Sequence, residues 1–392
     1  MASTVDTSVK HAYSSMTGAS IINGTAGSLI AALRAFLVTG WGAKAVDSAV
    51  ISNGVCRLTF ASGKSAAEIH SVISLSGALP AALNGDQRVT AVAAGWVEFK
   101  TSLPDGVVTG AISFKMSALG WEEVYSKANV SVFRPADPRS TRMFYRIDDS
   151  SGGHARVQMF ESMTDVDTGV GVSPSLAGGW YWPKSNNFPD ATPRYWLLIG
   201  NSRAFYYFEC AVNSSAAAPK SGAYGISSFA GDLNSYKSGD AWCGTVSGLS
   251  SASWTDRSGC LFQCAEEASF AVARQSHGVG VTAPSRRRAY RNNVSGADST
   301  FGAYPSRADN GLRMSSIIIT DGSDSSPRGE MPGALYCPQS GVNGVLGDKF
   351  GFLQGSGEFK NKTLISVPLY GDGTNPGTGF FDASGPWEPV NG

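Results

Sequence analysis

Two short acidic clusters are the first candidates for a catalytic or metal-binding role. Asp148 and Asp149 are adjacent, and Asp165 and Asp167 stand two residues apart in the segment Asp-Val-Asp-Thr-Gly. Paired carboxylates can act as acid and base in glycoside hydrolysis, and their oxygens are hard ligands that suit Ca²⁺. Asp side chains at strand ends also form turns, because their oxygens accept hydrogen bonds from the nearby backbone. We expect turns at both places, with Asp165 and Asp167 as the only calcium candidates.

The other residue types that commonly do chemistry show no catalytic pattern. The four histidines are far apart in sequence, and no H-E-x-x-H or G-x-S-x-G motif occurs. The six cysteines are scattered, and Cys260 and Cys264, spaced C-x3-C, have no second Cys or His pair nearby to complete a zinc site. We therefore expect free thiols, no cofactor, no structural metal and a protein that is not an enzyme.

Aromatic residues crowd into short segments of the chain. Trp180, Tyr181 and Trp182 are consecutive beside glycines and a proline, where an exposed platform could stack on sugar faces or fill a protein interface. In 204–212 the aromatics are also consecutive, so we expect both faces of that strand to be covered. Such clusters commonly form the core of a large β domain. We retain Trp180, Tyr181 and Trp182 as interface or glycan-binding candidates.

The densest positive charge lies in 285–291, which contains Arg286, Arg287, Arg288 and Tyr290. Arginines beside a tyrosine could bind phosphate or nucleic acid, and a contact with an acidic neighbouring subunit explains the run equally well. Lys+Arg and Asp+Glu are equal at 31 each, so no overall field draws the chain to nucleic acid or to an anionic membrane. We expect no direct nucleic-acid partner, and these four residues are further interface candidates.

Composition indicates many turns and few solvated helical faces. Charged residues make up 16% of the 392 residues, and 47 are Gly, against about 25% charged and roughly 7% Gly in typical soluble domains. No segment approaches the roughly 18 apolar residues of a membrane span, and the N-terminal segment lacks the apolar centre of a signal peptide. We expect a protein made in a cytoplasm, without a membrane span and with two or three domains.

The N-terminal third shows one helical pattern followed by short strands. Apolar residues recur at spacings of three and four between Asn23-Gly24-Thr25, which we expect to cap a helix, and Gly40. This spacing predicts an amphipathic helix of about four turns; the apolar residues are Leu29, Ile30, Leu33, Phe36 and Leu37. The pattern then changes to period two, with Asn53-Gly54 as a hairpin signal and Pro80 and Asn84-Gly85 as a further turn. Short strands at such regular spacing fit a small barrel or sandwich.

From Gly120 onward the strands are separated by long segments rich in Gly, Ser, Pro and Asn, such as 213–224 and 232–240. Connections of that length are uncommon unless they are functional or packed against a partner. The expected fold is therefore mainly β. It consists of an N-terminal arm and amphipathic helix in 1–44, a small β-barrel or sandwich module in 45–117, and a large β-sandwich-like domain with long loops in 118–392.

Several segments resemble known proteins. Gly-Ala-Leu-Pro-Ala-Ala-Leu-Asn-Gly at 77–85, Gln-Arg-Val-Thr-Ala-Val at 87–92 and Val-Thr-Gly-Ala-Ile-Ser-Phe-Lys at 108–115 resemble, in this order, a β module of structural proteins in tailed bacteriophages. Further segments are similar to a poorly characterised family of phage virion proteins: 119–122, 144–149, 163–169, 235–240, 332–339 and 377–387. The family implies no catalytic residues.

The resemblance implies a non-enzymatic structural component of a tailed bacteriophage particle, in the tail, neck or baseplate. Such a protein acts through homo-oligomeric assembly and contacts with other virion proteins. It would be located in the virion, which is assembled in the cytoplasm of the bacterial host. Two alternatives stay open. One is a glycan-binding protein of the virion that recognises the host surface through Trp180, Tyr181 and Trp182. The other is a virion-associated glycan hydrolase using Asp148, Asp149, Asp165 or Asp167.

Overall fold

The structure is a computed structural model that describes most of the chain. The described residues are 5–61, 63–185, 189–210, 225–252, 270–278, 284–288, 301–321, 326–342, 351–355, 359–368 and 378–387. Within them strands dominate and helix is confined to short segments. The mainly β class expected from the sequence is therefore confirmed.

The predicted amphipathic helix is present. Helix α1 (Ser28–Arg34) continues as one turn of π-helix, η1 (Ala35–Thr39), and Gly40 ends it with a positive φ of 69°. The apolar positions that predicted the helix are all buried: Leu29, Ile30, Leu33, Phe36 and Leu37. On its outer side Arg34 donates two hydrogen bonds, of 2.7 and 2.6 Å, to the carboxylate of Glu123. This pair fixes the helix against the following sheet.

The small β module is a closed barrel. Its strand order is β2-β9-β5-β6-β7-β4-β3-β8. Strands β8 and β9 belong to one bent segment of the chain. This segment pairs with β3 through β8 and with β5 through β9, so the sheet closes on itself. The bridge between Leu79 and Thr109 completes the closure. Asn53 and Gly54, both at positive φ, form the predicted hairpin turn. The elements are β2 (Trp41–Ala45), β3 (Ser48–Ser52), β4 (Val55–Thr59), β5 (Val72–Ser76), η2 (Ala81–Leu83), β6 (Gly85–Ala93), β7 (Trp96–Lys100), β8 (Gly106–Val108) and β9 (Ser113–Met116).

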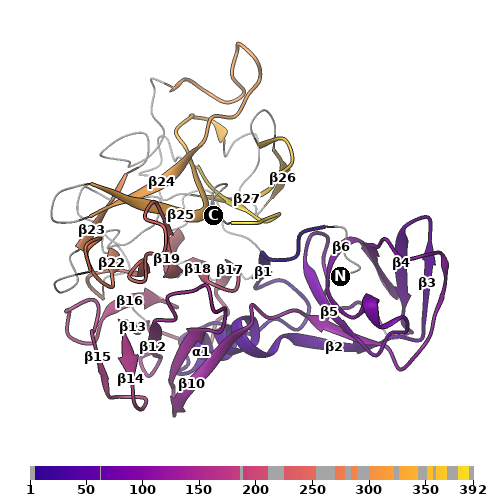
Figure 1. Cartoon of the computed structure of the whole chain (residues 1–392), viewed down its shortest axis with the longest axis horizontal. Coiled ribbons are helices and arrows are strands. Elements are labelled where there is room, and N and C mark those ends of the chain that lie inside the picture. The colour runs from indigo at the N-terminus through magenta and orange to yellow at the C-terminus, as the bar shows by residue number, and fades with distance from the viewer. Residues whose placement is uncertain are drawn as a thin grey trace.

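The second body is an antiparallel sheet of five strands in the order β10-β11-β12-β13-β16. Its strands are β10 (Trp121–Lys127), β11 (Val130–Pro135), β12 (Phe144–Asp148), β13 (His154–Phe160) and β16 (Trp180–Pro183). A short hairpin, β14 (Ser162–Met163) with β15 (Gly169–Val170), extends from its edge. Figure 1 shows this sheet beside α1, with the barrel standing to one side.

The remaining strands form one large sheet, 13-stranded in the part of the chain that the structure describes. It follows the order β1-β17-β18-β19-β21-β22-β23-β24-β25-β28-β27-β26, with β20 paired to β25. The N-terminal strand β1 (Lys10–Tyr13) thus enters the sheet of the C-terminal half, and Figure 1 places it between the barrel and that half. The others are β17 (Tyr195–Gly200), β18 (Ala204–Cys210), β19 (Gly225–Asp232), β20 (Asn234–Ser235), β21 (Gly244–Ser247), β22 (Phe270–Val272), β23 (Pro284–Arg288), β24 (Ser315–Thr320), β25 (Pro327–Cys337), β26 (Phe352–Gln354), β27 (Thr363–Pro368) and β28 (Thr378–Asp382).

Strand β18 separates two hydrophobic cores. Phe205 and Tyr207 belong to the core shared with the barrel, α1 and the five-stranded sheet, whereas Tyr206 and Phe208 belong to a core formed with the C-terminal strands. The ring of Tyr206 lies 4.7 Å from that of Phe381 on β28. Successive side chains of a strand point to opposite faces, so consecutive aromatics here mean two covered faces. The prediction for this strand is confirmed, and the result is a layered, sandwich-like arrangement.

Candidate functional site

The aromatic cluster of β16 is largely interior. Trp182 has no exposed surface, and its indole Nε1 donates a 2.6 Å hydrogen bond to the carbonyl oxygen of Ser247. Its ring meets the rings of Phe205 and Tyr207 at 5.9 Å each. Trp180 is also buried. The exposed platform considered from the sequence is therefore corrected: both tryptophan rings fill the space between the five-stranded and large sheets.

Tyr181 alone of the three aromatics is half-buried, because it points to the opposite face of β16. The guanidinium carbon of Arg156 lies 3.6 Å from its ring centroid. The same guanidinium donates to the carbonyl oxygen of Gly179 at 2.8 Å. The outer face of the Tyr181 ring is therefore partly covered by Arg156, which the loop before β16 holds in place.

Asp165 and Asp167 form a turn between β14 and β15. Asp165 Oδ1 accepts backbone hydrogen bonds from Asp167 (2.8 Å) and Thr168 (2.9 Å). Asp167 pairs with Lys127 at 2.6 Å and with Arg146 at 2.8 Å, and these cations lower its pKa. The turn interpretation is confirmed. Among the described residues no group of three or more His, Cys, Asp or Glu side chains is placed to hold a metal ion.

Asp148 and Asp149 do not face a common space. Asp148 is half-buried and lies 3.6 Å from Arg146 on the same strand. Asp149 is fully buried: its Oδ2 accepts hydrogen bonds from the backbone N–H of Leu29 and Ile30, and its Oδ1 pairs with Lys184. Burial raises its pKa. A glycosidase needs two carboxyl groups on either side of one bond, and these two point to different environments.

Asp149 also replaces the helix cap that the sequence predicted. The segment Asn23-Gly24-Thr25 was the expected cap, but the residue before α1 is Gly27 and makes no side-chain cap. The helix instead receives its acceptor from Asp149, 120 residues away from Leu29. We expected the cap close to the helix in sequence, because a helix cap is usually the residue that precedes the helix. Here a residue distant in sequence supplies the cap.

The arginine run lies on β23. Arg286, Arg287 and Arg288 stand opposite Thr320, Ile319 and Ile318 of β24. The structure describes only the backbone of these three arginines, and Tyr290 lies outside the described residues. Their role at an interface stays a prediction.

The described cysteines match the expectation of free thiols. Cys56, Cys210, Cys243 and Cys337 are free and buried, whereas Cys260 and Cys264 lie outside the described residues. Burial raises the pKa of all four described thiols. A buried protonated thiol is a poor nucleophile.

One arginine joins the barrel to both ends of the chain. Arg88 on β6 is buried, and its guanidinium donates to four backbone carbonyl oxygens. The acceptors are Asp6 (2.7 Å), Val9 (2.9 Å), His70 (2.7 Å) and Ala383 (2.9 Å). Two of these lie in the N-terminal arm, one in the barrel and one directly after β28. We call this contact the Arg88 joint.

Two histidines lie beside the Arg88 joint. The rings of His11 and His70 lie 5.2 and 5.0 Å from the ring of Phe352. Neither ring nitrogen of His11 has a hydrogen-bond partner among the described residues. Burial, with Arg88 and His70 nearby, lowers its pKa to about 3. On the same strand Lys10 pairs with Asp86 at 2.7 Å. These histidines are 59 positions apart in sequence, so spacing gave no sign that they meet.

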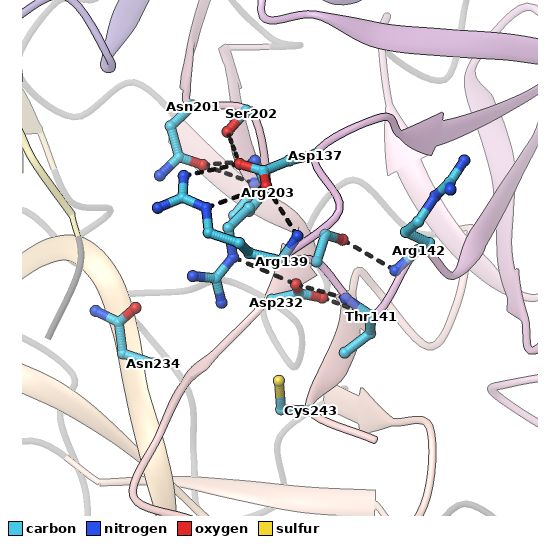
Figure 2. Close-up of polar contacts among 12 residues, drawn as sticks. Asp137, Arg139, Thr141, Arg142, Asn201, Ser202, Arg203, Asp232, Asn234 and Cys243 are labelled. Atoms are coloured by element: carbon cyan, nitrogen blue, oxygen red, sulfur yellow. Dashed lines mark hydrogen bonds and ion pairs between the residues drawn. The ribbon is translucent and has the colours of Figure 1, made fainter. Parts of the chain in front are cut away.

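A polar cluster ties the five-stranded sheet to the large sheet, as Figure 2 shows. Asp137, in the loop between β11 and β12, accepts hydrogen bonds from Arg139 and from Ser202 (2.7 Å) in the turn between β17 and β18. The hydrogen bond from Arg139 is the main reason that the pKa of Asp137 is lowered. We call this group, with Asp232 and its partners, the Asp137–Asp232 cluster.

Asp232, at the end of β19, is the buried half of that cluster. It accepts hydrogen bonds from the hydroxyl (2.5 Å) and the backbone N–H (2.9 Å) of Thr141, and it lies 3.5 Å from Arg203. Burial raises the pKa of Asp232. The thiol of Cys243 lies nearby (Figure 2), and burial raises its pKa too. Asp137 accepts a hydrogen bond from Ser202 and Asp232 accepts from Thr141, so each carboxylate is bound by a donor from another element. The cluster therefore fixes the β11–β12 loop, the β17–β18 turn and the end of β19 relative to one another.

A second buried ionic group joins the strands of the large sheet. Arg328 on β25 donates to both oxygens of Asp240 at 2.9 and 3.1 Å, and Ser235 donates to Asp240 at 2.7 Å. Arg328 also lies 3.7 Å from Asp321. Breaking a buried pair of this kind leaves an uncompensated charge, which is strongly destabilising.

Fold and site together define a mainly β protein with three bodies, a barrel and two sheets, held by buried polar contacts. Comparison of the sequence with models of known protein families and with curated proteins finds no match. In the described part of the chain no helix is long and apolar enough to cross a membrane.

Proposed function

We propose that the chain is a non-enzymatic structural component of a tailed bacteriophage particle. It belongs to the tail, neck or baseplate, and it assembles as a homo-oligomer in contact with other virion proteins. The proposal extends the resemblance of 77–92 and 108–115 to a phage β module, which corresponds to the part of the barrel around β6, β8 and β9.

The Arg88 joint is the observation that supports the proposal most strongly. A particle component must hold its parts at fixed angles while neighbouring subunits bind to each of them. One buried guanidinium with four carbonyl acceptors does this for the barrel, the N-terminal arm and the C-terminal strands. Hydrogen bonds to charged groups contribute roughly 1.5–3 kcal/mol each, so separating these parts is costly.

The barrel also carries apolar side chains suited to contacts between copies. Val50 on β3 and Val107 on β8 stand opposite each other and are 45% and 75% exposed. Leu79, bridged to Thr109 two residues after Val107, is 58% exposed. We assign the patch of Val50, Leu79 and Val107 to a contact with another copy of the chain, since neighbouring exposed apolar side chains mark interaction surfaces.

The two alternative functions are less well supported. Glycan stacking needs an open ring face, and Trp180 and Trp182 are buried. Hydrolysis needs two carboxyl groups around one bond, and Asp148, Asp149, Asp165 and Asp167 are engaged in separate contacts.

Two measurements test the proposal. Analytical ultracentrifugation of the purified chain is expected to show a closed oligomer, and mass spectrometry of purified particles is expected to detect the chain. A chain that stays monomeric over its whole concentration range and is missing from intact particles would overturn it.

A further inference from the structure

Lys184 and Asp149 form a fully buried ion pair. Lys184 follows β16, Asp149 follows β12, and both side chains have 0% exposure. The Nζ atom of Lys184 contacts Oδ1 of Asp149. Burying two charges usually costs more than their attraction returns. At this position a neutral reaction product would therefore be favoured over the charged pair of side chains.

The backbone holds both residues tightly. Asp149 donates its N–H to the carbonyl oxygen of Asn129 at 2.8 Å and accepts from Gly27 at 3.0 Å. Lys184 donates its N–H to Gly153 at 3.0 Å. The hydroxyl of Tyr207 donates to the carbonyl oxygen of Pro183, directly before the lysine, at 3.0 Å. Two reactive groups fixed in contact react as if at very high concentration.

The other atoms around the pair suit attack on a carboxyl group. Asp149 Oδ2 accepts hydrogen bonds from the backbone N–H of Leu29 (2.8 Å) and Ile30 (3.3 Å). Donors in this position stabilise the negative oxygen that develops during acyl transfer. Burial raises the pKa of Asp149, which favours the neutral carboxylic acid that can lose its hydroxyl. Lys184 Nζ donates to the carbonyl oxygen of Thr25 at 2.8 Å, which orients the amine.

We propose that Lys184 and Asp149 join in an intramolecular amide bond between Nζ and Cγ. A proton first passes from the ammonium group to Oδ1, which gives a neutral amine and a carboxylic acid. The nitrogen lone pair then attacks Cγ, and the negative charge develops on Oδ2. The Cγ–Oδ1 bond breaks, and Oδ1 leaves as water with a second proton from Nζ. No oxidant, reductant or other reactant takes part.

The product keeps the hydrogen bonds of the ion pair. The amide N–H still donates to Thr25, and the amide oxygen still accepts from Leu29 and Ile30. Two buried charges disappear, so no charged group is left to be solvated in the interior. The bond also links the C-terminal ends of β12 and β16, which flank β13 in the five-stranded sheet.

The other cation–carboxylate pairs in the described part of the chain lack one of these conditions. Lys10–Asp86 and Lys362–Asp382 are partly open to solvent, with one side chain of each pair 31% and 34% exposed. Water stabilises the charged forms there. Arg328–Asp240 is buried, but a guanidinium stays protonated and is not a nucleophile.

The intact mass of the native chain, measured after denaturation, tests the proposal. We expect a mass lower than that of the sequence by one water. Protease digestion is expected to give a branched peptide that joins Lys184 to Asp149, whereas the peptides of Lys10 and Asp86 stay linear as an internal control.

Lys184→Arg keeps the positive charge and cannot form the bond, so its mass is expected to match its own sequence. The proposal is overturned if the unmodified chain retains its full mass after prolonged incubation in the folded state. It is also overturned if the water is lost without the branched peptide, or if Lys184→Arg loses it as well. The decisive measurement uses the unmodified chain, so it does not depend on whether a variant folds.

Discussion

Arg88 in the barrel donates a 2.9 Å hydrogen bond to the carbonyl oxygen of Ala383, a residue 295 positions further along the chain. The same guanidinium reaches Asp6 and Val9 in the N-terminal arm. The two ends of the chain therefore meet at a single side chain of the barrel. This contact sets the orientation of the barrel relative to the large sheet.

Replacing Arg88 is expected to loosen the barrel from the rest of the protein. Arg88→Met leaves four carbonyl groups without their donor, and those of Val9 and Ala383 are buried. Each unsatisfied buried group costs roughly 1–3 kcal/mol, so we expect a loss of about 3 kcal/mol or more. The free energy of unfolding in urea and the rate of limited proteolysis at the N-terminal arm measure this.

Arg57→Met is the matched control for that experiment. Arg57 pairs with Glu98 on the outer face of the same barrel, with 53% of its side chain exposed. An exposed pair is worth about 0–1 kcal/mol. Equal losses for the two variants would contradict the role given to the Arg88 joint.

Acid is expected to destabilise the protein through His11. Its pKa is lowered from 6.5 to about 3 by burial, and then by Arg88 and His70. The unfolded chain therefore binds the proton more readily than the fold does. The stability that goes with the neutral ring is complete above pH 6.5 and falls as the pH drops towards 3, by up to about 1.4 kcal/mol per pH unit.

Unfolding measured between pH 6.5 and 4.5 checks the effect of His11. His11→Gln is expected to give a shallower dependence of stability on pH than the unmodified chain. His277→Gln, at an exposed histidine outside the Arg88 joint, is the control for the loss of a histidine elsewhere in the chain. The same slope in all three proteins would show that His11 does not titrate as the contacts indicate.

Val107→Glu is expected to weaken association between copies. The side chain is 75% exposed on β8, so the substitution leaves the fold intact while it places a charge in the apolar patch. Sedimentation velocity is expected to show smaller species. We expect the dissociation constant of the oligomer to rise at least tenfold, which is about 1.4 kcal/mol. Thr90→Glu, exposed on β6 away from β3 and β8 in the strand order, is the control. Unchanged assembly with Val107→Glu would remove this patch from the interface.

Trp182→Ala is expected to act on stability. Removal of a fully buried large aromatic costs about 3–5 kcal/mol, and here it also leaves the carbonyl oxygen of Ser247 without its donor. Thermal unfolding measures the loss. Tyr181→Ala, at the half-buried neighbour, is expected to cost clearly less. A stable Trp182→Ala protein that has lost binding on a glycan array would instead restore the stacking role.

The sequence predicted the elements whose signals are local. The three- and four-residue spacing of Leu29 to Leu37 predicted the helix, and Asn53-Gly54 predicted the first hairpin of the barrel. The turn at Asp165 was predicted because Asp side chains accept hydrogen bonds from the nearby backbone, as Asp165 does from Asp167. In each case the residues that form the structure are neighbours in the chain.

Contacts between distant segments escaped prediction. The acidic pair Asp148 and Asp149 reads as one motif in the sequence, yet Asp149 serves the N-terminal end of a helix 120 residues away. Trp182 lies in a sequence segment that is typical of an exposed aromatic platform. It is buried because β16 packs on β18, where its ring contacts Phe205 and Tyr207. Arg88 carries no local signal at all, because its four acceptors are backbone oxygens supplied by three separate segments.

The central claim, that the chain is a structural component of a phage particle, is tested most directly by a reconstruction of purified particles. The proposal predicts density for the barrel and the two sheets, repeated by rotational symmetry, in the tail, neck or baseplate. Particles that are complete and infectious without any copy of the chain would contradict it.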